Sequence, residues 1–544
     1  MQTTIKRPVR ARAARTPLFK SLRRLFGLAG LANQPNRPPV DELVEMPVRA
    51  AVNRREFLRL SATAAVAVGA GSWLTGCGTP RTWPHAPRIA IVGGGIAGLN
   101  AAWKLKQHGW PAAVYEASQR TGGRMFTAKN ILNPGLTTEL GGEFVDSNHH
   151  EMFALAREFR LPWLDMQSPG EEKLVREAFY FDGAHHKESL AIEAFRPLAG
   201  QIKRDHDKLG AVVDFETEGG GTELDRMSLA DYFNKIGAQG WIRKLLEVAF
   251  LTEFGRECGG QSALNMIFMI STDLAAGKLE LFGESDERYK IAGGNERIVD
   301  ELARRVQNQI HLDQKLLAMK SRDRGFTLTF DAGGRTNEVN ADFVILTLPF
   351  TMLREVDLQI TLPGWKRRAI TELGYGMNAK LLLGMKKRLW REQGHAGNIF
   401  SDEPFQLGWD NSRLQGGEAG GFTCYTGGKG SDELKFGTPQ DQAQRMLAAL
   451  EKPFPGMAAQ FNGRAERFHW PTHPFTKASY ACYLPGQWTT IAGAEGKAVG
   501  NLFFAGEHCS RDFQGFMNGG AETGKQAATD LRKALRDWQP AEVI

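Results

Sequence analysis

Arg88-Ile-Ala-Ile-Val92, followed directly by Gly93-Gly-Gly-Ile-Ala-Gly98, is the stretch of sequence that decides the fold. Its apolar first half predicts a short buried strand of a parallel sheet. Residues 99–107 predict a helix, with Gly109 just past its end as a C-cap. Residues 112–116 predict a second strand. Strand, glycine-rich turn, helix and strand in this order predict a dinucleotide-binding βαβ unit.

Each residue of the turn has a physical reason to be there. Gly93 permits the tight turn, Gly95 lets the backbone approach a pyrophosphate, and Gly98 lets the helix pack close to the strand. Ala97 belongs to the same expected cofactor-binding set, at the helix N-terminus whose free N–H groups attract phosphate. Glu116, at the end of the second strand, can accept hydrogen bonds from ribose hydroxyls. The alternative is a glycine-rich turn without a ligand.

Two further glycine elements carry a resemblance to a known family. Gly122-Gly-Arg124 follows the βαβ unit, and Leu140-Gly141-Gly142-Glu143-Phe144 comes later. With these elements the chain resembles the flavin-containing amine oxidases, which include monoamine, polyamine and L-amino acid oxidases. The resemblance implies FAD as cofactor, with Arg124 near its phosphates and the backbone of Gly141, Gly142, Glu143 and Phe144 near the flavin ring.

The resemblance extends over residues 88–544. It implies that Leu316, on a strand expected over residues 311–316, contacts adenine. It also implies that Gly506 and Glu507 lie near the ribityl chain and pyrophosphate. A helix starting near Met517 would point its positive end at the flavin, where the reduced ring carries negative charge.

The expected fold class is α/β. An FAD-binding Rossmann-like, doubly wound domain is discontinuous in sequence, and an α+β substrate-binding domain fills the gaps. The FAD-binding segments are residues 88–165, 288–350 and 490–540, and the substrate-binding segments are residues 166–287 and 351–489. The first substrate segment is helical by pattern, as in residues 229–254, and the second contains strand-like runs such as residues 380–385 and 421–425.

Three residues are the expected catalytic set, again by resemblance. Lys380 matches the lysine that holds a water at flavin N5, and its alternative is a solvated strand lysine. Tyr480 and Phe516 match the two walls of an aromatic cage that aligns the amine, and their alternative is core packing. Because monoamine oxidases carry tyrosine where this chain has Phe516, that substrate class is in doubt. Trp470 borders the pocket or packs in the core.

Other positions restrict the cofactor and the substrate. Ser479 stands where monoamine oxidases have the cysteine that bonds FAD, so FAD is expected to be non-covalent unless a thiol such as Cys482 substitutes. Glu143 either binds a cationic substrate amine or caps local backbone. No arginine follows it in residues 144–149, which disfavours an amino acid substrate. His149 and His150 are expected at the surface or at a helix start, and no metal site is predicted.

The basic charge of the chain is concentrated at its start. The 544 residues carry a formal charge of +7, but 13 of the 68 Lys and Arg and only four of the 61 Asp and Glu lie in residues 1–76. The remainder is nearly neutral, so nucleic acid is not an expected partner. A mean hydropathy of −0.34 and the lack of a long apolar run exclude a polytopic membrane protein.

Residues 1–76 are expected to be an export signal with a disordered basic leader. Arg54-Arg55-Glu-Phe-Leu58, followed by the uncharged residues 60–76, resembles a twin-arginine signal. Leu74-Thr-Gly-Cys77 resembles a lipoprotein cleavage box, so a lipid anchor at Cys77 on the periplasmic side is expected. Alternatives are an ordinary buried helix after a basic loop, or a cleaved signal without lipid. Met46 is an alternative start.

Four cysteines remain beyond Cys77, and none forms a C-x-x-C pair, so no thiolate metal site is supported. We expect them to be free and mostly buried. The predicted function is FAD-dependent oxidation of an amine to an imine, with O2 as acceptor and H2O2 as product. The alternatives are an L-amino acid oxidase or a desaturase-like enzyme, a dehydrogenase that passes electrons to a quinone or redox partner, and a non-catalytic flavin-binding lipoprotein.

Overall fold

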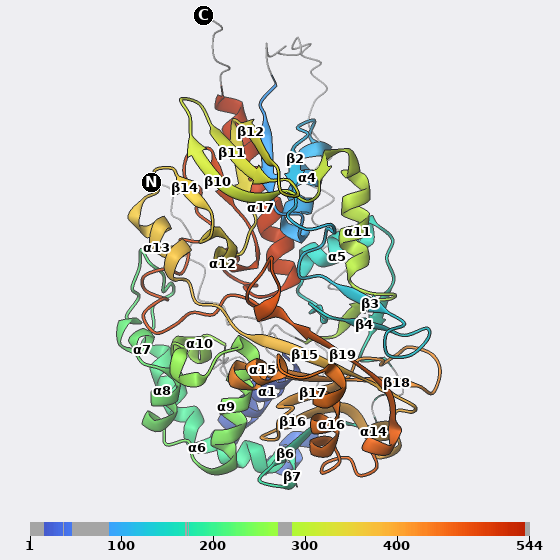
Figure 1. Ribbon diagram of the computed structural model, residues 1–544. Coiled ribbons are helices and arrows are strands. Elements are labelled where there is room, and N and C mark those ends of the chain that lie inside the picture. Colours follow the sequence, from blue (N-terminus) through green and yellow to red (C-terminus); the bar gives the residue numbers. More distant parts are fainter. Residues whose placement is uncertain are drawn as a thin grey trace, which may run out of the picture.

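The structure is a computed structural model with two domains, one above the other in Figure 1. The upper domain is built on a five-stranded parallel sheet, and the lower one on a seven-stranded mixed sheet. The described residues are 16–35, 37–45, 86–168, 171, 173–269 and 286–538.

The parallel sheet collects strands from three separate parts of the chain. Its order is β20-β13-β1-β2-β9, with β1 in the middle, and every neighbouring pair is parallel. The strands are β1 (Ile89–Val92), β2 (Ala113–Tyr115), β9 (Ile310–His311), β13 (Phe343–Leu346) and β20 (Leu502–Phe504). The residues of β1 and β13 are all buried, which explains their continuous apolar runs. The predicted α/β fold class is confirmed.

Two helices from opposite ends of the sequence pack against each other beside this sheet (Figure 1). They are α4 (Ile96–Gln107) and α17 (Met517–Asp537). Helix α4 begins three residues earlier than predicted, and Gly109 beyond its end has a φ of +80°, the left-handed conformation expected of a C-cap glycine. The domain is completed by α5 (His150–Glu158), α11 (Glu296–Arg305), and two short pairs, β3 (Thr127–Lys129) with β4 (Thr137–Glu139) and β5 (Trp163–Asp165) with β8 (Tyr289–Ile291).

A four-stranded sheet beside the parallel one corrects two predictions. Its order is β12-β11-β10-β14, with β10 (Lys315–Ser321), β11 (Phe326–Asp331), β12 (Thr336–Ala341) and β14 (Asp357–Gln359). The domain boundary at residue 350 is wrong, because β14 lies beyond it and pairs with β10. Residues 311–316 are not one strand either: β9 ends at His311 and β10 starts at Lys315.

The substrate-side domain has a sheet of order β19-β15-β18-β17-β16-β6-β7. Its strands are β6 (Val175–Phe181), β7 (Ala184–His186), β15 (Asn378–Met385), β16 (His395–Ser401), β17 (Leu407–Asp410), β18 (Gly420–Gly427) and β19 (Phe461–His469). The two strand-like runs near residues 380 and 421 are confirmed as β15 and β18, and both are buried throughout. The helical reading of residues 166–287 was incomplete, because β6 and β7 extend this sheet from within that segment.

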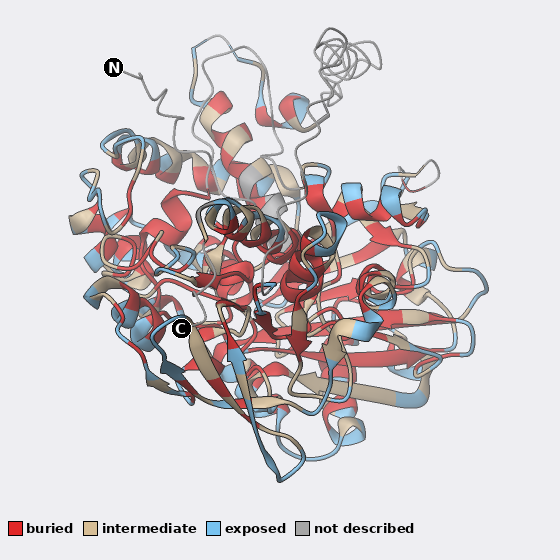
Figure 2. Ribbon diagram, turned by 90° about the horizontal axis from the view of Figure 1, so that it is seen from above, coloured by how far each residue is buried: buried red, intermediate tan, exposed pale blue. Residues whose placement is uncertain are grey.

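Helices cover this sheet and connect it to the parallel one. The longer ones are α6 (Glu188–Asp207), α8 (Leu229–Lys235), α9 (Gly240–Phe254) and α16 (Pro439–Leu450). The shorter ones are α7 (Thr222–Arg226), α10 (Leu264–Ile267), α12 (Phe350–Leu353), α13 (Gly364–Glu372), α14 (Leu389–Glu392) and α15 (Gly428–Leu434). One cluster of buried apolar side chains runs from Ala90 on β1 to Phe250 on α9, so the domains share a core (Figure 2).

The expectation of disorder before Arg54 is wrong for two described pieces. Residues Pro17–Ala32 form α1, which packs against α6 and α9, and Val40–Glu45 form α2. The rings of Phe26 and Phe195 are 4.3 Å apart, and Arg24 forms a 2.9 Å ion pair with Glu188. The Arg- and Ala-rich composition obscured an amphipathic helix with a buried apolar stripe. Residues 54–77, which carry the signal prediction, lie outside the described residues.

Across the described ranges, no helix is long and apolar enough to cross a membrane.

Candidate functional site

The segment from the end of β1 into α4 has two positions, Gly93 and Gly98, where only glycine fits. Gly93 has a φ of +109°, and a Cβ there would lie 2.4 Å from Oγ1 of Thr347. A Cβ on Gly98 would lie 2.0 Å from the carbonyl oxygen of Gly93. At Gly95, by contrast, the nearest atom to an added Cβ is Cα of Gly123 at 3.9 Å. The strand, turn and helix are therefore locked together, while the backbone of Gly95 faces open space at the N-terminus of α4.

Glu116 sits just after β2 and is already oriented by backbone groups. One carboxylate oxygen accepts from the N–H of Gly94 at 2.7 Å. The other accepts from the N–H and Oγ of Ser118 at 2.9 and 2.8 Å. The side chain lines the cavity described next, so a ribose hydroxyl placed there would meet a fixed acceptor.

A cavity of about 490 Å³ runs from this turn into the substrate-side domain. All the residues predicted for the cofactor and the reaction line it except Gly98, which packs behind the turn. They are Gly93, Gly95, Ala97, Glu116, Arg124, Gly141, Gly142, Glu143, Phe144, Leu316, Lys380, Tyr480, Gly506, Glu507, Phe516 and Met517. Trp470 also lines it. The volume is in the range of cavities that hold cofactors and small ligands.

Arg124 and Glu507 join the first and last segments of the nucleotide-binding domain across this cavity. Nη1 of Arg124 lies 2.8 Å from Oε1 of Glu507, and also donates to the carbonyl of Ser479 at 2.6 Å. The second carboxylate oxygen of Glu507 accepts from the N–H of Gly515 at 2.8 Å. The contact of Arg124 with phosphate stays a prediction, since the structure pairs this guanidinium with protein groups.

The Gly141-Gly142 element lies where no side chain fits. A Cβ on Gly141 would be 1.9 Å from the carbonyl oxygen of Arg124, and one on Gly142 would be 2.7 Å from Cγ of Met517. Helix α17 begins at Met517, with Phe516 as its N-cap. The bare backbone and a positive helix end therefore border the same part of the cavity, as expected for the neighbourhood of a flat ring.

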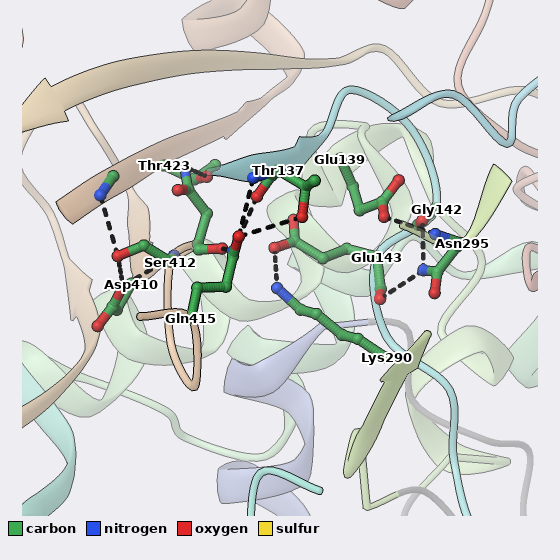
Figure 3. A network of polar contacts seen from close by, with 12 residues as sticks. Thr137, Glu139, Gly142, Glu143, Lys290, Asn295, Asp410, Ser412, Gln415 and Thr423 are labelled. Atoms are coloured by element: carbon green, nitrogen blue, oxygen red, sulfur yellow. Dashed lines mark hydrogen bonds and ion pairs between the residues drawn. The ribbon is translucent and has the colours of Figure 1, made fainter. Parts of the chain in front are cut away.

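Lys380 comes from β15 and is buried in a polar pocket, so the solvated-lysine alternative is excluded. Its Nζ donates to the carbonyls of Glu139 and Gly141 at 3.0 and 2.9 Å, and to Oε2 of Glu143 at 2.8 Å. The other oxygen of Glu143 accepts from Lys290 on β8 (Figure 3). Burial alone would raise the pKa of Glu143, but the two lysines lower it to about 2. These contacts support neither of the two predicted roles of Glu143, because its carboxylate pairs with two lysine side chains and not with backbone N–H groups or a free space for an amine.

The two cage residues are held by groups that the sequence did not identify. The hydroxyl of Tyr480 lies 2.8 Å from that of Tyr425 on β18 and 3.2 Å from the carbonyl of Thr252. The ring of Phe516 meets the ring of His149 at 4.9 Å, edge to face. Of the two alternatives for His149, the helix start is confirmed and the surface position is wrong: it is the fully buried N-cap residue of α5, and burial lowers its pKa to about 3. His150 is exposed.

Sequence reasoning missed four residues of this region: Lys290, Asn295, Trp409 and Tyr425. Asn295 donates to the carbonyls of Gly142 and Glu143, and Trp409 lies between Lys380 and Tyr425 (5.3 Å from Nζ and 5.4 Å between rings). A usable signal existed for Tyr425, which stands in a predicted buried strand. None existed for Lys290, because it is the antiparallel bridge between Val145 and Tyr289 that brings it near Glu143.

The cysteines behave as expected, and none reaches the cavity. The four described cysteines are thiols that form no disulfide with one another, and Cys482 does not line the cavity. Oγ of Ser479 is buried and donates to Asn378 at 2.5 Å. In the part of the chain that the structure describes, no group of three His, Cys, Asp or Glu side chains is placed to hold a metal ion.

The arrangement fits FAD. One cavity is lined by three features that suit this cofactor. They are a glycine turn and helix end that can bind a pyrophosphate, a carboxylate that can accept from a ribose hydroxyl, and bare backbone beside a second helix end. Within it, Gly95 and Glu116 would hold the nucleotide half, and the backbone of Gly141 and Gly142 with the start of α17 would hold the ring.

Comparisons with known proteins agree with this arrangement. Residues 96–532 match the family described as flavin containing amine oxidoreductase. A flavin-containing amine oxidase of Danio rerio is 23% identical over 84% of this chain and 88% of its own, and an L-amino acid dehydrogenase of Synechocystis sp. is 24% identical over 80% and 93%. The structure of cyclohexylamine oxidase from Brevibacterium oxydans IH-35A superimposes with a TM-score of 0.72 at 20% identity, covering 83% of this chain and all of that one. With a family match over most of its length, the chain belongs to the flavin-containing amine oxidoreductases and is an FAD-dependent oxidoreductase.

Proposed function

We propose that this enzyme oxidises an amine at the carbon next to nitrogen, with O2 as electron acceptor. Two electrons and two protons leave the amine to give an imine, and O2 takes them up to give H2O2. The observation that carries the proposal is the far end of the cavity, where Tyr480 and Phe516 line the same space as the bare Gly141-Gly142 backbone.

FAD, when bound, supplies the acceptance and release of electrons. The residues of the chain hold and desolvate the substrate. Aromatic rings of Tyr480 and Phe516, with Trp409 and Tyr425 nearby, favour a neutral amine with an apolar substituent and restrict its orientation. Lys380 contributes a fixed positive charge, because all three protons of its ammonium have protein acceptors. In this arrangement a water must displace one acceptor before Lys380 can hold it.

A simple amine is favoured over an amino acid by the partners of the cationic side chains. A substrate carboxylate needs a cation at the cage, and Lys380, whose Nζ lies 5.3 Å from the ring of Trp409, already pairs with Glu143. Arg124 pairs with Glu507. L-amino acids are the second candidate, supported by the Synechocystis relative named L-amino acid dehydrogenase.

The test is the visible spectrum of the purified holoenzyme under anaerobic conditions. We expect the flavin absorption to bleach with apolar primary or secondary amines and not with L-amino acids, and to return on admission of O2 with formation of H2O2. Bleaching by amino acids alone would transfer the proposal to that substrate class. Recovery with a quinone but not with O2 would identify a dehydrogenase, and no bleaching by any member of the panel would leave a flavin-binding protein without turnover.

We further propose that FAD is bound without a covalent link. By resemblance, Ser479 matches the position of the cysteine that bonds FAD in monoamine oxidases, and Cys482 lies outside the cavity lining. Denaturation of the holoenzyme should leave all flavin in the supernatant. Flavin that stays on the precipitated chain, or on a peptide containing Cys482, would overturn this.

The location of the protein is also a proposal. The pattern from Arg54 to Cys77 supports export by the twin-arginine route and a lipid anchor at Cys77 on the periplasmic side. Cleavage before Cys77 would remove α1 and α2 from the core that they share with α6 and α9. Mapping the N-terminal peptide of the protein from its native membrane fraction, with a search for lipid on Cys77, distinguishes the two forms.

A further inference from the structure

Lys290 is a buried lysine that no part of the proposed reaction uses. It lies on β8, and its ammonium forms an ion pair with one oxygen of Glu143 (Figure 3). Lys380 pairs with the other oxygen at 2.8 Å. All three residues are buried. The ring of Phe144 lies 4.8 Å from Nζ of Lys290, on a face of the cluster that borders the cavity.

The cluster carries two positive charges and one negative charge. Glu143 is ionised, because the two lysines hold its pKa near 2 against the effect of burial. A further carboxyl group, Glu139, has its pKa raised by burial to about 7, and so is largely neutral at pH 6. Asn295 fixes the backbone of this loop by donating to the carbonyl of Glu143 at 2.8 Å. At pH 6 the cluster therefore has one net positive charge.

Without Lys290 the charge of Lys380 would be cancelled by Glu143. A lone Lys380–Glu143 pair is neutral, and its field at the cavity is that of a dipole. With Lys290 on the other oxygen, Glu143 is shared, and a full positive charge remains beside the Gly141-Gly142 backbone. In a buried environment one charge acts strongly on a neighbouring group that changes charge.

We propose that Lys290 is a positioning residue of the flavin reaction. By pairing with one carboxylate oxygen of Glu143, Lys290 offsets the negative charge of that residue, so that Lys380 acts on the flavin with an uncancelled positive charge. A positive charge beside the ring favours the reduced, anionic flavin and the transfer of electrons to O2. The proposal rests on the FAD chemistry of the proposed function, but not on its substrate.

The experiment measures the flavin midpoint potential at pH 6 by reduction with a chemical reductant and a reference dye, so no amine is involved. It also measures the rate constant of the chemically reduced enzyme with O2. Lys290→Met should shift the ratio of reduced to oxidised flavin by roughly tenfold or more toward the oxidised form, because one unit of positive charge near the ring is lost. Lys290→Arg should stay close to the wild type.

The double variant Glu143→Gln/Lys290→Met separates charge from packing. It leaves Lys380 as the single charge of the cluster, so its potential should return to the wild-type value. Lys290→Gln, which keeps a hydrogen-bond donor for Glu143, replaces Lys290→Met if that variant does not retain FAD. The proposal would be overturned if Lys290→Met or Lys290→Gln had the wild-type midpoint potential. It would also be overturned if the potential of the double variant did not return to the wild-type value. A protein that fails to oxidise amines but shows these shifts would refute only the proposed function.

Discussion

The hydroxyl groups of Tyr425 and Tyr480 lie 2.8 Å apart, and this contact ties a strand of the substrate-side sheet to one wall of the cage. Tyr425 stands on β18, opposite Lys380 on β15. The pairing of β15 with β18 therefore fixes the position of Lys380 and of Tyr425, the tyrosine that holds this wall.

Replacing Tyr425 with phenylalanine removes the hydroxyl and keeps the ring. Tyr480 then loses the hydroxyl of Tyr425 and keeps the 3.2 Å contact to the carbonyl of Thr252. A hydrogen bond of this kind contributes about 1 kcal/mol, so we expect kcat/KM for the best amine to fall about fivefold, mostly through kcat. Steady-state kinetics checks this, with Tyr180→Phe on β6 of the same sheet as control. An unchanged kcat/KM would show that Tyr480 needs no support from Tyr425.

Lys380→Met tests the role of the buried ammonium. We expect FAD to remain bound and reduction by amine to persist, while the reaction of reduced enzyme with O2 slows by roughly tenfold or more, because the charge beside the ring is lost. Stopped-flow measurement of the two half-reactions separates these steps. The control is Lys386→Met, an exposed lysine just past the end of β15. O2 kinetics like those of the wild type would contradict a role in reoxidation.

The motifs show where sequence is sufficient and where it is not. Gly93, Gly98 and Gly141 could be predicted, because each stands in a short glycine motif that is visible in the sequence. Lys290 could not, since its partner Glu143 lies 147 residues away in the sequence. For Tyr425 the buried strand could be predicted, but its partner Tyr480, 55 residues away, could not. The helix start at His149 could be predicted, but its burial could not, because burial depends on the contact of its ring with Phe516.

His149, which contacts the cage residue Phe516, also makes the stability of the protein sensitive to acid. It is fully buried, and burial lowers its pKa from 6.5 to about 3. The unfolded chain takes up a proton below pH 6.5 and the folded one does not, so this residue reduces the free energy of unfolding as the pH falls from about 6.5 toward 3, by up to about 1.4 kcal/mol per pH unit. His149→Asn keeps a good N-cap for α5 and cannot be protonated. Its Tm should fall less than that of the wild type between pH 7 and pH 5.

His508 has its own burial-lowered pKa, of about 4, and remains in both proteins, so some acid sensitivity will persist. A second control is His150→Asn at the exposed neighbouring position, which should leave the pH dependence of Tm unchanged. Parallel Tm curves for the wild type and His149→Asn would mean that His149 is not the group that titrates.

The packing of α1 can be tested through Phe26, whose ring meets Phe195 at 4.3 Å in the core between α1 and α6. In the full-length holoenzyme, Phe26→Ala should lower the free energy of unfolding by about 3 kcal/mol, as expected for removing a buried ring. Asp41→Ala, at an exposed position of α2, should lower the free energy of unfolding by only a few tenths of a kcal/mol. Denaturant unfolding followed by flavin fluorescence measures both. Equal stability of Phe26→Ala and the wild type would show that α1 does not belong to the core, and that the chain folds around α6 and α9 without it.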